Sequence, residues 1–444
     1  MSSLSAFLPN PSLPAFLPNT SLSVFLPNPP DPAARQPFST AAFLVPCSLH
    51  YVLAVLAILP HTFILKLALF PIFLWQVWKF TVEQDLSVAL ANSLGHESSA
   101  RLRHWNYALA VRFCHRTSSH FFLTPLTTQT WLVGAMLRSL AWTFAREPLR
   151  RYNPPVEGQQ AAPIERPLTI QNVLLDAFDL MFNLRGIGWS WSPKPFPKAS
   201  TWSTSTPGML ARLLLNFVAF DTSHYLIQRI RPSLNDPAGD TIFDSTLTIV
   251  PRFALAAFCT ICAAVMVGTR MNIFSLITSL IGRILFRQPA WRYPPLFQRP
   301  WESTSLAEFW SFHWHQNHRY VFVSLGARPL GAILGRPGAL LGAFAVSGVK
   351  NNLQTWALGN GMETRSVSGF FLITGSGLAL EYGFKQVTGH RVGGPWGWLW
   401  TLVWSVCWGT MIIDSWARSG FMASDFFAFA PRPGKWLVDA IASL

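Results

Sequence analysis

Charged residues are scarce in this chain of 444 residues. Only 12% are Asp, Glu, Lys or Arg, whereas half are hydrophobic, and neither 36–65 nor 392–413 contains a charged residue. A helix rising 1.5 Å per residue crosses roughly 30 Å of hydrocarbon, so each of these segments is long enough to span a bilayer. This composition argues against a set of soluble domains. It predicts an all-α fold: a polytopic transmembrane helical bundle with about seven to nine spans.

Cysteine is also sparse. The five cysteines are Cys47, Cys114, Cys259, Cys262 and Cys407. They are scattered and odd in number, so no disulfide framework is expected. Two of them form a C-x-x-C inside an apolar run without a second pair. We therefore expect buried small side chains here, rather than a zinc or redox site.

Blocks of like charge are missing, although the net charge is +14. The basic residues occur singly or in pairs, and no run of five or more appears. Such a distribution is typical of loops that flank membrane helices. An anionic lipid bilayer is therefore the expected partner, and nucleic acid is not.

Signatures of several soluble enzymes are absent. No histidine is followed by Asp four or five positions later, and Gly375-Ser-Gly377 lacks the outer glycine of G-x-S-x-G. There is no P-loop and no dinucleotide fingerprint. His313, His315 and His318 form an H-x-H-x-x-H, but the i, i+4 spacing of H-E-x-x-H is missing, so no metal site is expected.

The chain divides into four parts. Residues 1–40 carry a proline-rich repeat containing Phe-Leu-Pro-Asn three times, which predicts a disordered tail. Residues 41–160 hold two apolar runs, 41–59 and 62–80, and then a polar loop. The short connection between the runs predicts an antiparallel membrane hairpin. Residues 161–430 form the expected core, and 431–444 a C-terminal tail.

Within the core, apolar runs predict further membrane helices. They occupy 209–230, 253–269, 271–286, 338–349, 366–380 and 392–413, with a weaker candidate at 117–137. Asp221 and His224 lie three apart and share a helical face. A buried hydrogen-bonded structural pair is the favoured interpretation, with catalysis as the alternative.

The most informative stretch is Ser305-Leu-x-Glu-Phe-Trp-x-x-x-Trp-His-Gln-x-x-Arg319. Ionisable groups beside membrane segments are costly and mark functional sites. An aromatic belt at the bilayer interface would account for the same composition. The neighbouring sequence decides between them.

Together with Pro294-Pro-Leu-Phe297, this stretch resembles the wax synthase-like branch of the membrane-bound O-acyltransferases. It is most similar to fungal members that acetylate hydroxyls of terpenoids and related secondary metabolites. Three further segments agree in order: Arg185-Gly-Ile-Gly-Trp189, Phe344-Ala-Val-Ser-Gly348 and 381–400. The resemblance covers roughly residues 165–425 and leaves out the N-terminal repeat.

The resemblance implies a helical bundle in the endoplasmic reticulum membrane, with a tunnel where acyl-CoA meets an alcohol. No permanently bound cofactor is implied, because acyl-CoA is a co-substrate. In this family a histidine on the helix after the Ser-Gly pair is the general base, and the residue at the position of His315 assists it. Imidazole titrates near neutrality, and general-base assistance is worth roughly 10²–10⁴-fold in rate.

At the family's histidine position this chain has Asn351, preceded by Lys350 where the pattern is apolar. An amide cannot act as a base, although its N–H can stabilise an oxyanion. Either His315 or His318 replaces the base, or the register shifts locally, or the protein is an inactive relative. A non-enzymatic membrane protein such as a transporter is the competing class. The sequence thus assigns catalytic roles to His315, Asn351 and His318. It assigns substrate contacts to Trp310, Trp314, Glu308 and Arg319.

Overall fold

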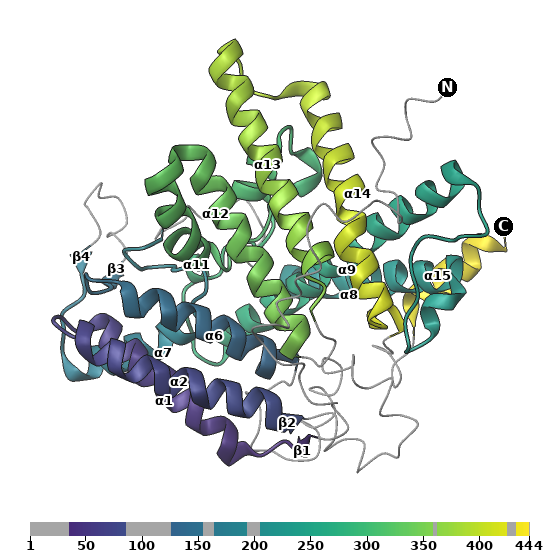
Figure 1. Ribbon diagram of the computed structural model, residues 1–444. Coiled ribbons are helices and arrows are strands. Elements are labelled where there is room, and N and C mark those ends of the chain that lie inside the picture. Colours follow the sequence, from purple (N-terminus) through teal and green to yellow (C-terminus); the bar gives the residue numbers. More distant parts are fainter. Residues whose placement is uncertain are drawn as a thin grey trace.

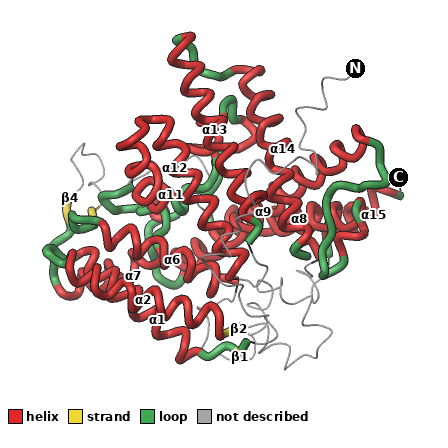
Figure 2. The backbone as a smooth tube through the Cα atoms, in the orientation of Figure 1, coloured by secondary structure: helices red, strands yellow, loops and turns green. Residues whose placement is uncertain are grey.

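The computed structural model describes residues 35–85, 126–153, 164–192, 205–357, 362–423 and 432–443. The proline-rich repeat and most of the polar loop predicted before residue 160 lie outside these ranges. The described residues are predominantly helical (Figures 1 and 2), so the predicted all-α class is confirmed. The helices are α1 (Thr40–Ile58), α2 (Phe63–Glu83), α6 (Leu126–Phe144), α7 (Ile170–Phe182), α8 (Thr206–Ile230), α9 (Ile249–Ile284), α10 (Leu306–Glu308), α11 (Arg319–Phe322), α12 (Arg328–Ala357), α13 (Thr364–Thr388), α14 (Gly394–Arg418) and α15 (Pro433–Ala442).

Two short strand pairs close loops at the edge of the bundle. β1 (Gln36–Pro37) pairs in parallel with β2 (Gln84–Asp85), which ties the start of α1 to the end of α2. β3 (Tyr152–Asn153) pairs antiparallel with β4 (Ile164–Glu165) just before α7.

The N-terminal helices form one packed layer. α1 and α2 make the predicted antiparallel hairpin and pack against α6 and α7 (Figure 1). Ser39 begins α1 because its hydroxyl accepts the N–H of Ala42 at 3.3 Å. His50 stacks 4.9 Å from Trp142 between ring centroids, and its Nδ1 lies 2.8 Å from the Ser139 hydroxyl. This histidine is a buried core residue, although its Nε2 has no hydrogen-bond partner.

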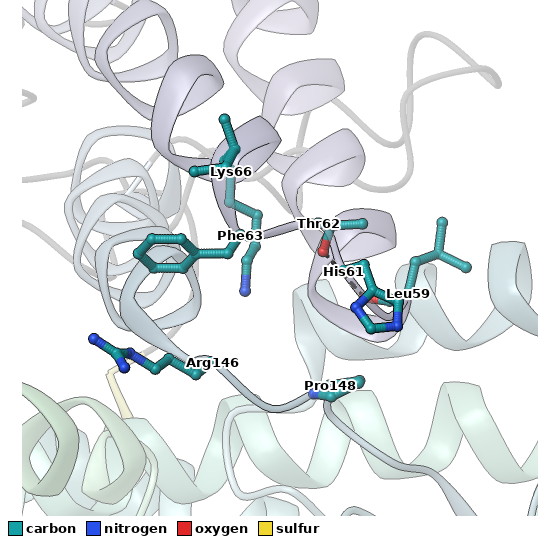
Figure 3. A pocket seen from close by; sticks show the side chains of 8 residues that line it. Leu59, His61, Thr62, Phe63, Lys66, Arg146 and Pro148 are labelled. Carbon is teal, nitrogen blue, oxygen red and sulfur yellow. Dashed lines mark hydrogen bonds between the residues drawn. The ribbon is translucent and has the colours of Figure 1, made fainter.

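A cavity of about 390 Å³ lies where the α1–α2 turn meets the segment after α6 (Figure 3). Its basic lining residues are His61, Lys66 and Arg146. Lys66 is buried and donates to the carbonyl oxygens of Trp142 and Ala145 at 2.8 and 2.6 Å, so it caps the end of α6. None of the site residues predicted from the sequence lines this cavity.

The second layer contains α8, α9, α13 and α14, whose buried apolar side chains form another core. The two apolar runs predicted at 253–269 and 271–286 are one continuous helix, α9, of 36 residues. The prediction of two separate runs was wrong, because Arg270 interrupts the hydrophobicity but not the helical backbone. The side chain of Arg270 lies beside the ring of Phe421 at 5.8 Å.

The C-terminal helix α15 is fixed against α8 by a buried polar cluster. Asp221 and His224 are both fully buried, as expected. Asp221 accepts from Arg432 Nε at 2.8 Å and from the N–H of Gly434 at 2.7 Å. His224 Nδ1 lies 3.3 Å from a guanidinium nitrogen of Arg432. The structural interpretation of these two residues fits this geometry.

Six helices among the described residues are long and apolar enough to cross a membrane, compared with the seven to nine predicted. They are Thr40–Ile58, Phe63–Glu83, Ile249–Ile284, Arg319–Ala357, Thr364–Thr388 and Gly394–Arg418. The predicted candidate at 209–230 does not belong to this set, and residues 117–125 of the weaker candidate at 117–137 lie outside the described ranges.

The segment Arg319–Ala357 folds back on itself. Gly335 has a φ of 64°, and Pro337 follows it. Residues Gly326 and Gly342 are in backbone contact, with no room for a Cβ at either position. In a straight helix these residues would lie roughly 24 Å apart. The break therefore creates a tight helical hairpin, whose second arm carries Lys350 and Asn351.

Candidate active site

The central stretch begins at a strongly capped helical turn, α10. The hydroxyl of Ser305 accepts the N–H of Glu308 at 3.0 Å, and the Glu308 carboxylate accepts the N–H of Thr304 at 2.8 Å. This arrangement is close to a capping box. The hydrogen bonds from Thr304 lower the pKa of Glu308. The carboxylate predicted to contact substrate is thus engaged in fixing the local backbone.

A second carboxylate, from α13, holds the same turn. Glu381 is buried and accepts the N–H of Leu306 at 2.7 Å and that of Ala307 at 2.9 Å. The indole N–H of Trp400 donates to the same side chain at 2.9 Å. A negative charge at a helix N-terminus satisfies free N–H groups and complements their partial positive charge. Segments 305–308, 381 and 400, which carry parts of the resemblance, therefore meet at one point.

The backbone changes conformation immediately before the two central histidines. Residues Phe309–His313 form a π-helical turn, residues 314–318 are not helical, and α11 begins at Arg319. Gln316 closes the turn by donating to the carbonyl oxygens of Trp310 and Trp314 at 2.8 and 2.9 Å. π-Helical turns often occur at functional sites. Here the turn places His315 and His318 in a non-helical segment between two helical ones.

The imidazoles of His315 and His318 lie side by side, with ring centroids 6.4 Å apart and planes at 87°. Each ring keeps some accessible surface although protein closely surrounds it. The Nδ1 of His315 is buried without a hydrogen-bond partner. On the far side, a Cβ at Gly134 of α6 would stand 4.0 Å from Cε1 of His318. Two unengaged imidazoles in one enclosed place are the chemically most suggestive feature of the described residues.

The charges that act on these two rings are positive. Burial, together with the nearby charges of Lys350 and Arg185, lowers the pKa of His315 to about 3. Burial likewise lowers the pKa of His318 well below its usual value, with Lys350 and Arg138 adding to the effect. Both rings are therefore neutral at pH 7 and can accept a proton or a hydrogen bond.

Asn351 lies on α12, next to Lys350. Its side-chain amide donates to the carbonyl oxygen of Ser347 at 2.9 Å, one turn back in its own helix. Within the part of the chain that the structure describes, no hydrogen bond joins Asn351 to either imidazole. Lys350 is the residue of this helix that acts on both rings.

The remaining predicted substrate-contact residues occupy different surroundings. Trp314 stacks on Phe309 at 5.3 Å, and Trp310 packs edge-on against Phe344 at 5.6 Å. The indole nitrogen of Trp310 is buried without a partner. Arg319 is exposed and contacts Gln316 at 3.4 Å. The tryptophans thus belong to the enclosed region with the histidines, whereas Arg319 does not.

The third histidine of the H-x-H-x-x-H pattern has a separate role. His313 is buried, its Nδ1 hydrogen-bonds the carbonyl oxygen of Gln298, and its Nε2 lies 3.3 Å from Glu308. It fixes the Pro-Pro-Leu-Phe loop to the π-helical turn. No group of three or more His, Cys, Asp or Glu side chains among the described residues could hold a metal ion.

The Arg-Gly-Ile-Gly-Trp segment forms one wall of this region. Gly186 has a φ of 69°, and a Cβ there would collide with the ring of Trp191, which packs 4.8 Å from Tyr320. Arg185 donates to the carbonyl oxygen of Pro294 at 2.7 Å. The segments Arg185–Trp189 and Pro294–Phe297, both singled out in the sequence, therefore lie in contact.

Sequence reasoning did not assign a role to three cations that affect the two rings. Lys350 carried a signal, because it occupies an apolar position of the family pattern. Arg185 carried a weaker one, as part of a matching segment. Arg138 carried none, since it lies in α6 outside every motif, where it donates to the carbonyl oxygen of Met181 at 2.8 Å.

Comparison with known proteins identifies a family match for the central part of the chain. Residues 293–373, which contain the central stretch and Asn351, match the membrane bound O-acyl transferase family. The resemblance to the membrane-bound O-acyltransferases is confirmed. The matched acyltransferase segment holds His315, His318 and Lys350, whereas Arg138 and Arg185 reach it from outside.

Two fungal proteins are similar to this chain. The O-mevalon transferase yanI of Aspergillus niger is 31% identical over 152 residues, which are 32% of this chain and 34% of that protein. The acetyltransferase ple2 of Rhodocybe pseudopiperita is 26% identical over 251 residues, which are 53% of this chain and 64% of that protein. The chain thus matches about a third and somewhat under two thirds of the length of these relatives.

Proposed function

We propose that this chain is an O-acyltransferase of the endoplasmic reticulum membrane. It moves an acetyl or other acyl group from acyl-CoA to a hydroxyl of a lipophilic, terpenoid-like or long-chain alcohol. The observation that carries the proposal is the pair of neutral, enclosed imidazoles, His315 and His318, inside the segment that matches the acyltransferase family. The names of the two relatives, a transferase and an acetyltransferase, support the reaction class.

In the proposed reaction His315 is the general base. Its neutral imidazole takes the hydroxyl proton as the alcohol oxygen attacks the thioester carbonyl. The tetrahedral intermediate then expels the CoA sulfur, which leaves as the free thiol after the imidazolium returns the proton. The ester and CoA are the products. Burial disfavours the imidazolium, and the negative charge that develops on the carbonyl oxygen opposes that penalty.

His318 and Asn351 are proposed to assist. The ring of His318 lies within contact range of His315 and fixes its orientation. Asn351 has a second side-chain N–H beyond the one given to Ser347, which is available for the carbonyl oxygen of the thioester. Trp310 and Trp314 would supply the apolar surface against which the alcohol lies.

The test uses microsomes that contain the full chain, labelled acetyl-CoA and a panel of lipophilic alcohols. We expect ester from the wild type, little or none from His315→Ala, and more from Asn351→His, which restores the family's residue. His390→Ala, at an exposed position, is the matched control and should behave as wild type. No ester from any of these proteins would instead support an inactive relative or a transporter.

A further inference from the structure

Lys350 is a buried cation without a carboxylate partner among the described residues. Only 7% of its surface is exposed, and its ammonium donates to the amide oxygen of Gln354 at 2.8 Å. Because the side chain is enclosed, it does not extend to the membrane surface as lysines near helix ends usually do. A buried charge with one neutral acceptor is costly unless something else neutralises it.

The surroundings of Lys350 increase this cost. The charged groups that act on the neighbouring His315 and His318 are Lys350, Arg185 and Arg138, all of them positive. Glu308, the acid on the central stretch, is engaged with Thr304 and His313. The enclosed region beside the two imidazoles is therefore electropositive and suited to an anion.

The inference rests on the proposed function, which limits the anions that can lie beside Lys350. The phosphates of CoA are at the far end of a long pantetheine arm, and the end that carries the thioester is uncharged. An acetyl group or an unsubstituted acyl chain brings no charge either. With such an acyl group, a formal negative charge next to the reacting groups belongs to the acceptor.

We infer that the acceptor is a hydroxy acid, whose carboxylate pairs with the ammonium of Lys350 while its hydroxyl faces His315. A carboxylate supplies the counter-charge and satisfies the N–H donors that Gln354 leaves unused. The ion pair also orients the hydroxyl, which a purely apolar tunnel would do poorly.

The experiment measures binding, so it does not depend on turnover. The purified full chain in detergent is titrated with 3-hydroxydodecanoate, whose hydroxyl lies near its carboxylate, and with its methyl ester, which lacks only the negative charge. We expect the acid to bind the wild type at least tenfold more tightly than the ester. Lys350→Met should remove this preference, and Lys350→Arg should keep most of it. Equal affinity for acid and ester in the wild type would overturn the inference.

Two controls distinguish a carboxylate site at Lys350 from binding elsewhere and from a purely structural lysine. Arg146→Met removes a cation from the cavity of Figure 3, and it should leave the preference for the acid intact. If Arg146→Met abolishes the preference and Lys350→Met does not, the acid binds in the cavity beside Arg146 and the inference is wrong. The melting temperature of ligand-free Lys350→Met should equal or exceed that of the wild type, because an unpaired buried charge is gone. A purely structural lysine would give a lower melting temperature.

The microsome test and the binding test can fail independently. Absence of ester in the microsome test, with the preference for the acid intact, would reject the proposed reaction but not the carboxylate site.

Discussion

The carboxylate of Glu381 on α13 accepts the N–H of Leu306 at 2.7 Å, at the start of the segment that carries His315. The second carboxylate oxygen accepts the neighbouring N–H of Ala307 at 2.9 Å. One membrane helix thus positions the candidate active site through two charge-assisted bonds to the backbone of another segment.

Glu381→Gln should weaken this connection. An amide can accept only one of the two N–H groups and turns its own N–H toward the other, so we expect a loss of about 1.5–3 kcal/mol in stability. Acyl transfer should fall by about tenfold, since misplacement of the histidines lowers the rate. Thermal unfolding in detergent and the microsome assay measure the two effects. Glu302→Gln, at an exposed position, is the control, and equal behaviour of both variants would contradict the prediction.

We expect Asp179 to stabilise the Arg-Gly-Ile-Gly-Trp segment, which forms one wall of the candidate active site. It forms ion pairs with Arg151 and Arg292 and accepts the indole N–H of Trp189 at 2.9 Å. Asp179→Asn leaves two partly buried guanidinium groups without their counter-charge, at a cost of about 3 kcal/mol. The melting temperature in detergent should drop clearly. Asp236→Asn, in an exposed turn, should not change it, and a similar drop in both would refute the argument.

Gly342→Ala should disrupt the hairpin that carries Lys350. A Cβ at this position would overlap the backbone of Gly326, and neither backbone can move away easily. We expect a destabilisation of about 3 kcal/mol, at the upper end for overpacked sites. Gly383→Ala is the control, because a Cβ there meets no atom within 4 Å. That variant should gain about 0.5–1 kcal/mol from helix propensity. The melting curves of the two variants, compared with that of the wild type, measure the expected loss and gain of stability.

The stability of the protein should decrease on acidification below pH 6.5, partly through His224. Burial, with the charge of Arg432, lowers the pKa of His224 in the folded chain to about 3, compared with 6.5 for an unperturbed histidine. Between these values the unfolded chain binds a proton that the folded chain does not. The free energy of unfolding therefore falls by about 1.4 kcal/mol per pH unit for this residue as the pH decreases, and above pH 6.5 the effect vanishes.

His224→Gln isolates this contribution. The slope of stability against pH between 6 and 4.5 should be smaller in the variant than in the wild type, because one linked proton is removed. Melting temperatures in detergent at several pH values measure the slope. His390→Gln, at an exposed position, should keep the wild-type slope. Identical slopes for His224→Gln and the wild type would show that folding does not lower the pKa of His224.

Much of the fold follows from the sequence, because long apolar runs without charge have few alternatives to a membrane helix. The α1–α2 hairpin was predicted from its two runs and the short connection between them. The continuity of α9 was not, since Arg270 interrupts the hydrophobic pattern while an isolated arginine does not end a helix. The reversal at Gly335 within α12 was also missed, although a glycine followed by Pro337 permits it.

The motif residues drew attention to His315 and His318, but not to their arrangement. In the structure the two rings lie side by side in one enclosed region. Their placement after a π-helical turn depends on Gln316 and on the capping by Glu381, and these interactions join residues distant in sequence. The grouping of Lys350, Arg185 and Arg138 around the two rings likewise depends on packing between three separate segments, which no local pattern encodes.

The length of α9 determines on which sides of the membrane its two ends lie. At 36 residues it extends about 54 Å, well beyond the roughly 30 Å of a hydrocarbon core. A single pass of α9 places Thr248 and Leu285 on opposite sides of the bilayer, whereas a re-entrant pair of shorter helices would return both to the same compartment.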